Sequence, residues 1–378
     1  MDSLTDKFFE LLRLAIGTSV EVPSLTFADI KGIYEIAKKQ SLLGVLFNAL
    51  DKGGFKPTDV EQHKDEFEDL LMQWMGDKVK IERRNEKLNK DVVEVTDWLN
   101  KEGFESCLLK GQGNALLYPN PSLRTCGDID LWVRPKVSNG FENDIKTIIS
   151  FVRKNAQSKC RAIYHHVDGL EWNSTEVEVH YRPHFMQDFT YNARLQKYFL
   201  DNADKQFRHY VPINIKEVAV PTPSFNIVFQ ISHIYQHLFK EGIGLRQVLD
   251  YYYVLKSYAE LHNKDGINWN KVLTYLGLKN ITSAIMWILI RKFGMNPDWA
   301  IVESDEKRGR FVLNEILQGG NFGKYDERNA RFGHSKIGKN VQRICRDARL
   351  VRYFPSEALI EPFFRIWHAW WRYRHDTF

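Results

Sequence analysis

The segment Gly127-Asp128-Ile129-Asp130-Leu131 places two carboxylates in an otherwise aliphatic run, and it constrains the fold more than any other part of the sequence. The run 128–133 predicts a buried β-strand. Alternate residues of a strand lie on one face about 6.6 Å apart, so Asp128 and Asp130 are expected to point together. Paired carboxylates repel each other and lose hydration unless a cation lies between them. Because Mg²⁺ prefers oxygen ligands, the segment predicts a magnesium site.

A third carboxylate is expected from the later β-prone run Glu176-Val177-Glu178-Val179-His180. Its two glutamates and His180 share one face of the predicted strand, while Val177 and Val179 take the other. Glu178 is the preferred third ligand and Glu176 the alternative. Divalent ions held by such carboxylates can bridge a triphosphate and stabilise the attacking and leaving oxygens of an in-line displacement, which indicates nucleotidyl or phosphoryl transfer.

Basic and glycine residues around these strands are candidates for phosphate binding. Lys110 and Gly111 lie where a predicted strand gives way to a helix, so free backbone N–H groups could meet a phosphate. Arg124, three residues before Gly127, could make paired hydrogen bonds to a polyphosphate. The Gly-Gln-Gly sequence beginning at Gly111 has neither a dinucleotide fingerprint nor Walker A spacing, which argues against those two sites.

This order of motifs resembles the DNA polymerase beta-like nucleotidyltransferase superfamily, and more closely an uncharacterised bacterial nucleotidyltransferase family. The matching segments are Leu109-Lys110-Gly111, Tyr118-Pro119, Arg124, Gly127-Asp128-Ile129-Asp130-Leu131, Glu178-Val179-His180-Tyr181-Arg182, His233, His237, Leu245-Arg246 and Leu249-Asp250. Two positions depart from the superfamily pattern. Gln112 follows Gly111 where serine or glycine is usual, which leaves open how phosphate is held. Glu178 stands where relatives often carry aspartate.

The resemblance implies a magnesium-dependent enzyme that moves an NMP group from an NTP to an acceptor and releases pyrophosphate. Asp128, Asp130 and Glu178 would be catalytic and would hold two Mg²⁺ ions, or Mn²⁺ in their place, and Glu178 would help to deprotonate the acceptor. Lys110, Gly111, Arg124 and Gly127 would bind the nucleotide, with ATP as the expected NTP. The acceptor is left open among a small molecule, a peptide or protein, and RNA.

The periodicity along the chain predicts an α+β fold in which a small mixed β-sheet is flanked by N- and C-terminal helical regions. The expected units are a helical region 1–104, a nucleotidyltransferase core 105–220 and a helical domain 221–378. Strands are expected at 106–109, 128–133, 161–167 and 176–181, and core helices at 112–117 and 143–152. Either Asp168-Gly169 or Asn173-Ser174 could form the turn between the last two strands.

Charge, cysteines and hydropathy restrict the class of protein. The net charge of +5 is too small to identify a nucleic-acid or membrane binder. The longest uncharged apolar stretch, 281–290, is far shorter than the roughly 20 residues of a spanning helix. The acidic start lacks the pattern of a secretory signal, and the four scattered cysteines suggest neither a disulfide framework nor a zinc site. Cytoplasmic location is therefore expected.

Two other functions remain open from the sequence. A catalytically inactive module could bind a nucleotide or RNA, and an interaction protein could act through its helical regions. The basic segment Lys339–Arg352 could be a solvated face or an anion-binding stripe. His233 and His237, one helical turn apart, are expected to pack or hydrogen-bond rather than bind metal, and Arg246 and Asp250 are expected to form a helix-surface ion pair.

Overall fold

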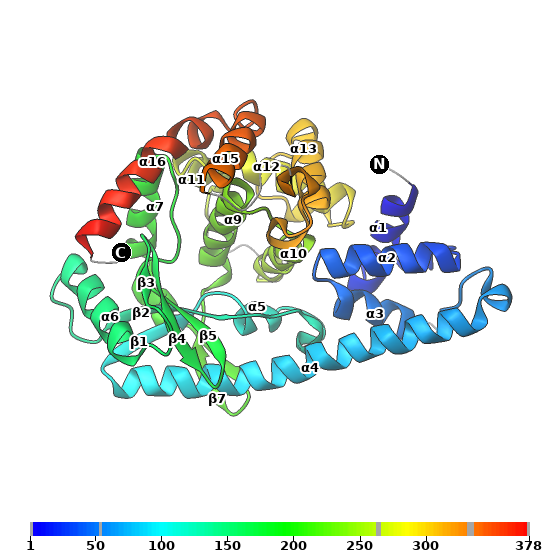
Figure 1. The fold of residues 1–378 in the computed structure, drawn as a ribbon, viewed down its shortest axis with the longest axis horizontal. Coiled ribbons are helices and arrows are strands. Elements are labelled where there is room, and N and C mark those ends of the chain that lie inside the picture. The colour runs from blue at the N-terminus through cyan, green and yellow to red at the C-terminus, as the bar shows by residue number, and fades with distance from the viewer. Residues whose placement is uncertain (1–2, 53–54, 262–265, 331–335, 376–378) are drawn as a thin grey trace.

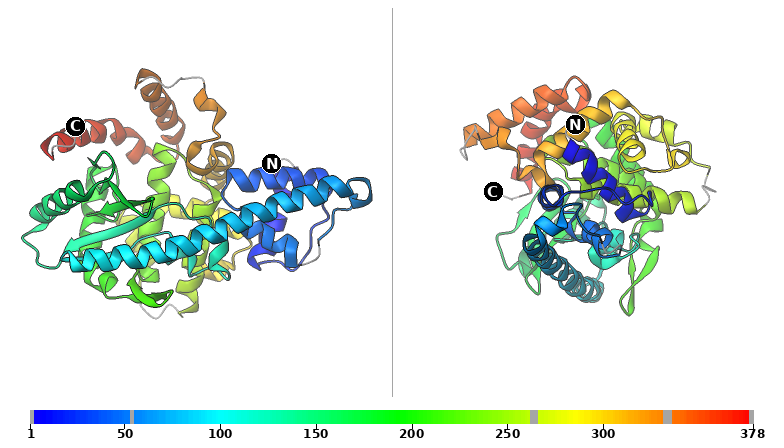
Figure 2. Two further views of the ribbon diagram at one scale, coloured as in Figure 1. Left: turned by 60° about the horizontal axis from the view of Figure 1, so that its bottom comes forward. Right: turned by 90° about the vertical axis from the view of Figure 1, so that its right-hand side faces the viewer.

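The computed structural model describes residues 3–52, 55–261, 266–330 and 336–375 of the chain, and it has the predicted α+β architecture. A five-stranded sheet lies among helices, with the N-terminal helices at one end of the elongated molecule and α16 above the sheet at the other (Figure 1). The long helix α4 runs beneath both parts and joins them (Figures 1 and 2).

The N-terminal region forms a helical cluster that feeds into α4. Its elements are α1 (Ser3–Ile16), α2 (Phe27–Lys39), α3 (Leu43–Lys52), η1 (Val60–Gln62) and α4 (Lys64–Lys101). Helix α2 begins at a capping box in which Thr26 accepts from the backbone of Asp29 and the Asp29 carboxylate accepts from the backbone of Thr26. Helix α4 keeps apolar residues on one side over 38 residues, so it packs against the N-terminal helices first and the sheet afterwards.

The sheet has the strand order β1-β2-β5-β4-β3. Strand β2 pairs antiparallel with β1 and parallel with β5, and β4 pairs antiparallel with both β5 and β3. The elements of this region are β1 (Phe104–Leu108), α5 (Gln112–Ala115), η2 (Pro121–Leu123), β2 (Ile129–Pro135), α6 (Phe141–Asn155), β3 (Arg161–Ala162), β4 (His166–Trp172) and β5 (Thr175–His180). The sheet is therefore small and mixed, as predicted.

The two faces of the sheet differ in polarity because residues alternate along each strand. Leu131, Val177 and Val179 face one side, where they share an apolar core with α4 and α6. Asp130 and Glu178 face the other side, where they are paired in the register of β2 with β5. The sheet is thus anchored through one face and presents ionisable groups on the other.

Helices from the second half of the chain cover the polar face of the sheet. They follow α7 (Phe189–Asp201), α8 (Ala203–Phe207) and a separate hairpin of β6 (Tyr210–Ile213) and β7 (Lys216–Ala219), which the sequence did not predict. The covering region contains α9 (Pro223–Lys240), α10 (Leu245–Glu260), α11 (Trp269–Tyr275), α12 (Lys279–Arg291), η3 (Pro297–Trp299), α13 (Glu306–Gly319), η4 (Asn321–Gly323), α14 (Glu327–Ala330), α15 (Lys336–Leu350) and α16 (Pro355–Arg374).

Two local predictions were wrong in detail, and the structure decides between two predicted turns. The strand expected at 128 begins at Ile129, so Asp128 precedes it. The strand expected at 161–167 is divided, because the backbone leaves the sheet at residues 163–165 and β4 begins at His166. Of the two turns considered between the last two strands, Asn173-Ser174 is confirmed, with both residues at positive φ, whereas Asp168 lies inside β4, where a bulge interrupts the pairing. Short polar residues at positive φ suit a tight hairpin turn.

The N-terminal and C-terminal helical regions share one hydrophobic core, while the sheet has a second. Buried Gln40, at the end of α2, donates to the carbonyl of Ile316 and accepts from the backbone N–H of Leu245. The predicted division at 104 and 220 stays a prediction. No helix within the described ranges combines the length and the apolar character needed to cross a membrane.

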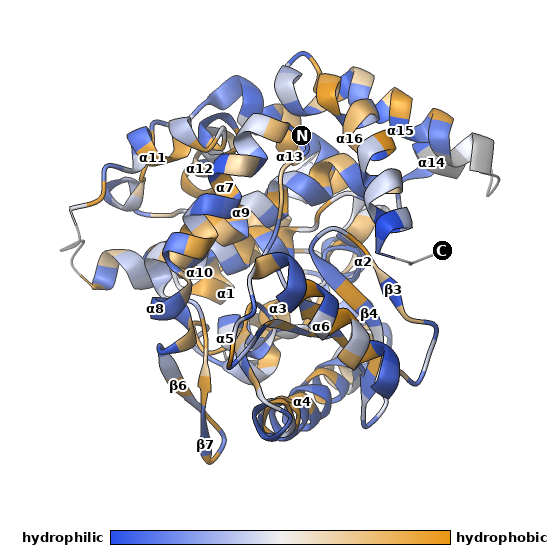
Figure 3. Ribbon diagram, turned by 90° about the vertical axis from the view of Figure 1, so that its left-hand side faces the viewer, coloured by the Kyte–Doolittle hydropathy of each residue, from blue (hydrophilic) through white to orange (hydrophobic). Residues whose placement is uncertain are grey.

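The last helix, α16, carries hydrophobic residues on both its buried and its exposed side, mixed with hydrophilic ones (Figure 3). Phe364 and Trp371 are buried in the core of the sheet region. The opposite side exposes more than half of each of Leu359, Phe363, Ile366, Trp370 and Tyr373. The tryptophans at this end are therefore divided between the core and the surface.

Candidate active site

A cavity of about 650 Å³ lies between the polar face of the sheet and helices α9, α10, α15 and α16. All seven residues predicted for catalysis and nucleotide binding line it, which are Lys110, Gly111, Arg124, Gly127, Asp128, Asp130 and Glu178. Its volume is within the range of small-molecule sites, about 300–1,000 Å³. The strand ends and the covering helices therefore bring the predicted residues to one place.

The carboxylates differ in their surroundings. Asp130 on β2 and Glu178 on β5 are register partners, and Oδ1 of Asp130 and Oε2 of Glu178 lie 3.1 and 3.3 Å from Nε2 of His180. Asp130 is 1 % exposed, whereas Asp128, which directly precedes β2, is exposed. Glu176, the alternative third ligand, is exposed and does not line the cavity. The preferred set of acids thus faces one cavity, with Asp128 at its open side.

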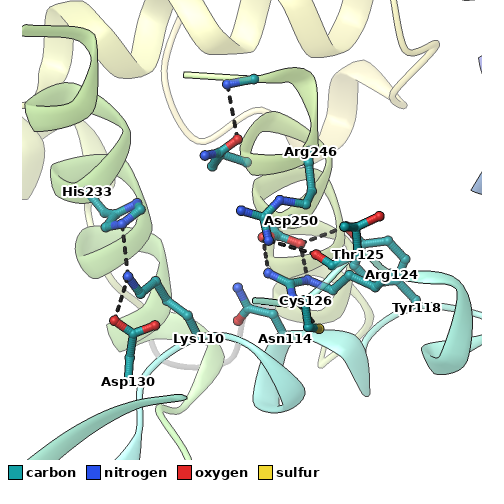
Figure 4. Close-up of polar contacts among 12 residues, drawn as sticks. Lys110, Asn114, Tyr118, Arg124, Thr125, Cys126, Asp130, His233, Arg246 and Asp250 are labelled. Carbon is teal, nitrogen blue, oxygen red and sulfur yellow. Dashed lines mark hydrogen bonds and ion pairs between the residues drawn. The ribbon is translucent and has the colours of Figure 1, made fainter. Parts of the chain in front are cut away.

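Lys110 connects the sheet to α9. Its ammonium donates to Oδ1 of Asp130 at 2.8 Å and lies 3.1 Å from Nε2 of His233 (Figure 4). Burial lowers the pKa of Lys110, but Asp130, Asp128 and Glu178 raise it more, so the net shift is upward. Burial and the positive charge of Lys110 hold the pKa of His233 well below its usual range. A neutral His233 can accept a hydrogen bond from the charged lysine.

The acid pair also controls the ionisation of His180. Burial lowers the pKa of His180, but its hydrogen bonds to Asp130 and Glu178 outweigh burial and raise the pKa to about 9. Burial raises the pKa of Glu178, but His166, His180 and Lys110 more than offset it and hold the value well below normal. The carboxylate of Asp130 beside it, together with partial loss of hydration at the cavity wall, raises the pKa of Asp128. At neutral pH the site therefore holds an imidazolium, an ammonium and an ionised Glu178.

The ionisation of His180 predicts a pH dependence of stability for the metal-free protein. Because its folded pKa of about 9 exceeds the ordinary 6.5, its contribution is fully present below pH 6.5 and is lost as the pH rises through 9. A shift of this size corresponds to about 3 kcal/mol. Urea unfolding between pH 6 and pH 10 should show a larger fall in stability for wild type than for His180→Gln. Parallel curves for the two proteins would contradict the assignment.

Gly111 shapes the turn that positions Lys110. It has φ 55° and ψ −118°, a conformation that residues with a side chain avoid. The following Gln112 points away from the cavity and donates to the side chain of Asn89 and the carbonyl of Asn85, both on α4. The glutamine that departs from the superfamily pattern therefore fastens this turn to α4, and its side chain does not line the cavity.

Gly111→Ala is expected to reduce stability by about 1–3 kcal/mol, because alanine must adopt the strained backbone or move the turn. Chemical denaturation measures this loss. Gly127→Ala is the matched control, since its added Cβ would meet no atom within 4 Å and its φ lies outside the positive region. Equal stabilities of the two variants would show that the turn tolerates a side chain.

Arg124 lies in the cavity wall but is tied to α10. Its Nε and one terminal nitrogen donate to the two carboxylate oxygens of Asp250, both at 2.7 Å, and its other terminal nitrogen contacts the sulfur of Cys126 (Figure 4). Tyr118 donates to the same carboxylate at 2.7 Å. Asp250 thus pairs with Arg124 and not with Arg246, the partner predicted one turn away. Arg246 instead donates to the carbonyl of Thr125.

Sequence reasoning missed several groups that line the same cavity. These are His165, His166, Asp168, His184 and Lys240. The alternation of His166 and Asp168 on one strand face was a usable signal, but the strand was expected to end at residue 167, and Asp168 was considered only as one of two possible turn positions. His233 and His237 also line the cavity, with ring centroids 4.3 Å apart.

The predicted basic stripe on α15 divides into residues with different surroundings. Arg346 is buried and donates to the carbonyls of Phe239 and Lys240, while Arg349 pairs with Glu315. Arg343 is exposed and lines the cavity. Arg331, a basic residue that precedes this stripe and is a further candidate for anion binding by sequence, lies outside the described residues. The stripe is therefore not a continuous solvated face.

The donor atoms around the acid pair fit a divalent cation. Asp130, Glu178 and His180 each offer one ligand atom within 4.8 Å of the others, and so do His166, Asp168 and Glu178. Asp128 lines the same cavity outside these clusters. Carboxylate oxygens that are charged at neutral pH are what Mg²⁺ binds, and in the structure the cations beside them are Lys110 and His180.

The model of a family described as an uncharacterised nucleotidyltransferase matches residues 27–294, which include every predicted site residue. No curated protein matches the chain. Among solved structures, the chain is similar to an antigenic nucleotidyltransferase-like protein from Paracoccidioides brasiliensis, with 16% sequence identity and a TM-score of 0.29. That match covers 51% of this chain and 93% of the other.

Proposed function

Because this chain belongs to that uncharacterised nucleotidyltransferase family, we propose that it is an active, metal-dependent enzyme that transfers an NMP group from an NTP to an acceptor and releases pyrophosphate. The observation that carries the proposal is the convergence of Asp128, Asp130, Glu178 and Lys110 on one cavity. Their charges match a polyphosphate with its divalent ion, since carboxylates would face the metal and an ammonium the phosphate.

Asp128, Asp130 and Glu178 are the proposed metal ligands and catalytic residues. Two Mg²⁺ ions bound there would neutralise charge on the triphosphate, and Mn²⁺ could replace them. Glu178 is ionised at neutral pH because of its cationic neighbours, so it is ready to bind a cation. Its low pKa makes it a weak base in the metal-free protein, so Glu178 is proposed first as a metal ligand and second as the group that helps to deprotonate the acceptor.

Lys110 and Gly111 are proposed to bind the triphosphate. Gly127, which has no side chain, would leave room for it just before β2. Binding of cations to Asp130 would free the ammonium of Lys110 from its present partner. Arg124 is better described as a positioning residue, because Asp250 already satisfies its paired donors. Arg246, half-buried in the same wall, can take the role first given to Arg124.

The acceptor is proposed to enter from the side of α15 and α16. Lys240 and Arg343 line that side, and Lys240 lies 4.4 Å from the ring centroid of Phe185. An aromatic and cationic wall favours an acceptor with a planar or anionic group. The cavity volume favours a small molecule or a single reactive end of a peptide, protein or RNA.

Incubation of the protein with Mg²⁺ and each α-labelled NTP, over a panel of small-molecule, protein and RNA acceptors, tests the proposal. Label transferred to an acceptor with release of pyrophosphate would support it, with ATP as the expected donor. Transfer that persists in Asp128→Ala at the wild-type level would remove the assigned site. Calorimetry that finds NTP binding without pyrophosphate release over the whole panel would instead support the inactive binding module.

A further inference from the structure

A second cluster of potential ligands lies beside the proposed catalytic acids, toward the outer edge of the sheet. His166 and Asp168 project from β4 on the face of the sheet that carries Glu178 of β5. One ligand atom from each lies within 4.8 Å of the others. Glu178 belongs both to this cluster and to the one that contains Asp130, so the two clusters adjoin.

The contacts within the second cluster are close but poorly directed. Nε2 of His166 lies 2.8 Å from Oδ1 of Asp168, and Nδ1 of His166 lies 3.3 Å from Oε2 of Glu178. Nevertheless, Nδ1 of His166 and Oδ1 of Asp168 are buried atoms without a hydrogen-bond partner. Buried polar atoms without partners are costly. His166 is only 8 % exposed, so water provides little compensation.

A metal ion would satisfy both unpartnered atoms together with the shared glutamate. We propose that His166, Asp168 and Glu178 form a second metal site, beside the Asp128 and Asp130 carboxylates, that takes a transition ion such as Mn²⁺ or Zn²⁺ in preference to Mg²⁺. The imidazole decides the preference, because Mg²⁺ selects oxygen ligands whereas nitrogen ligands favour first-row transition ions.

The site lies at the acceptor side of the cavity. His165 and His180 adjoin His166, with ring centroids 4.3 and 5.0 Å from that of His166. Nδ1 of His165 and Nδ1 of His180 also lack hydrogen-bond partners. The imidazole of His165 therefore offers a further nitrogen ligand beside His166. This site goes beyond the proposed function and depends on it only for the neighbouring acids.

Metal binding without nucleotide tests the inference. Chelator-treated full-length protein is loaded with Mn²⁺, Zn²⁺ or Mg²⁺, desalted and assayed for metal content, and affinities are measured by calorimetry. Wild type is expected to retain Mn²⁺ or Zn²⁺ more tightly than Mg²⁺. His166→Gln and Asp168→Asn should each weaken that binding by more than about tenfold. Nitrogen couplings in the Mn²⁺ resonance spectrum should disappear in His166→Gln.

Two controls separate this site from its surroundings. His237→Gln removes a cavity imidazole outside the ligand clusters, and Asp128→Asn removes an acid of the proposed magnesium site; both should keep the tightly bound ion. Equal affinity of wild type and both cluster variants would overturn the inference, as would loss of the ion in Asp128→Asn. Asp168 is partly exposed, so its variant is informative even if His166→Gln fails to fold. A nucleotidyltransfer assay that fails would leave these binding results unaffected.

Discussion

Replacement of Asp130 by asparagine is expected to lower nucleotidyl transfer by about 10³-fold or more, equivalent to at least about 4 kcal/mol of transition-state stabilisation. The change keeps the shape of the side chain but removes the buried charge that faces both Lys110 and His180. It should also weaken Mg²⁺ binding, which calorimetry measures independently of turnover.

The matched control is Glu171→Gln, which removes an exposed carboxylate from β4 that does not line the cavity. Its transfer rate should stay within about twofold of wild type, as for most surface substitutions. Thermal unfolding of both variants shows whether the loss arises at the site or from misfolding. Near-normal transfer by a folded Asp130→Asn protein would refute the proposed catalytic role.

Asp250→Ala is expected to destabilise the protein by about 3–5 kcal/mol, because it leaves the Arg124 guanidinium buried without its charge partner. Both side chains are almost completely buried, at 3 and 4 % exposure. The same change removes the acceptor of the Tyr118 hydroxyl. Urea unfolding measures the loss as a lower transition midpoint.

Tyr118→Phe is the companion variant, since it removes one hydrogen bond to Asp250 but keeps the ion pair. Its expected cost is about 1 kcal/mol. The double variant Arg124→Met, Asp250→Leu should recover stability relative to Asp250→Ala, since no unpaired charge remains. A cost for Asp250→Ala no larger than that of Tyr118→Phe would mean that this ion pair does not fasten the loop to α10.

Much of the site could be predicted from short patterns. Alternation along Gly127–Leu131 and Glu176–His180 correctly indicated two strands that carry acids on one face, and the register of Asp130 with Glu178 agrees with it. The strand boundary was less predictable. Asp128 lies just before β2, because strand pairing and not the local pattern decides where a strand begins.

The roles of the charged side chains depended on partners far away in the sequence. The sequence predicts Arg124 as a phosphate ligand. In the structure its paired donors bind the carboxylate of Asp250, which lies 126 residues later in the chain. By sequence, Gln112 departs from the superfamily pattern at the predicted phosphate turn. Its contacts with Asn85 and Asn89 of α4 give it a structural role instead. His166 and Asp168 became a candidate site only when β4 was found to continue through a bulge.

Periodicity in the sequence alone determined the α+β class and the acidic face of the sheet, because side-chain direction repeats every two residues in a strand. The order of the motifs and the family resemblance indicated that Lys110, Asp128, Asp130 and Glu178 belong to one constellation. Only the tertiary structure decided which charges neutralise one another and which are left to meet a ligand. That selection depends on burial and on distances between remote segments, since a charged group has low energy in a protein interior only where its particular partner lies within reach.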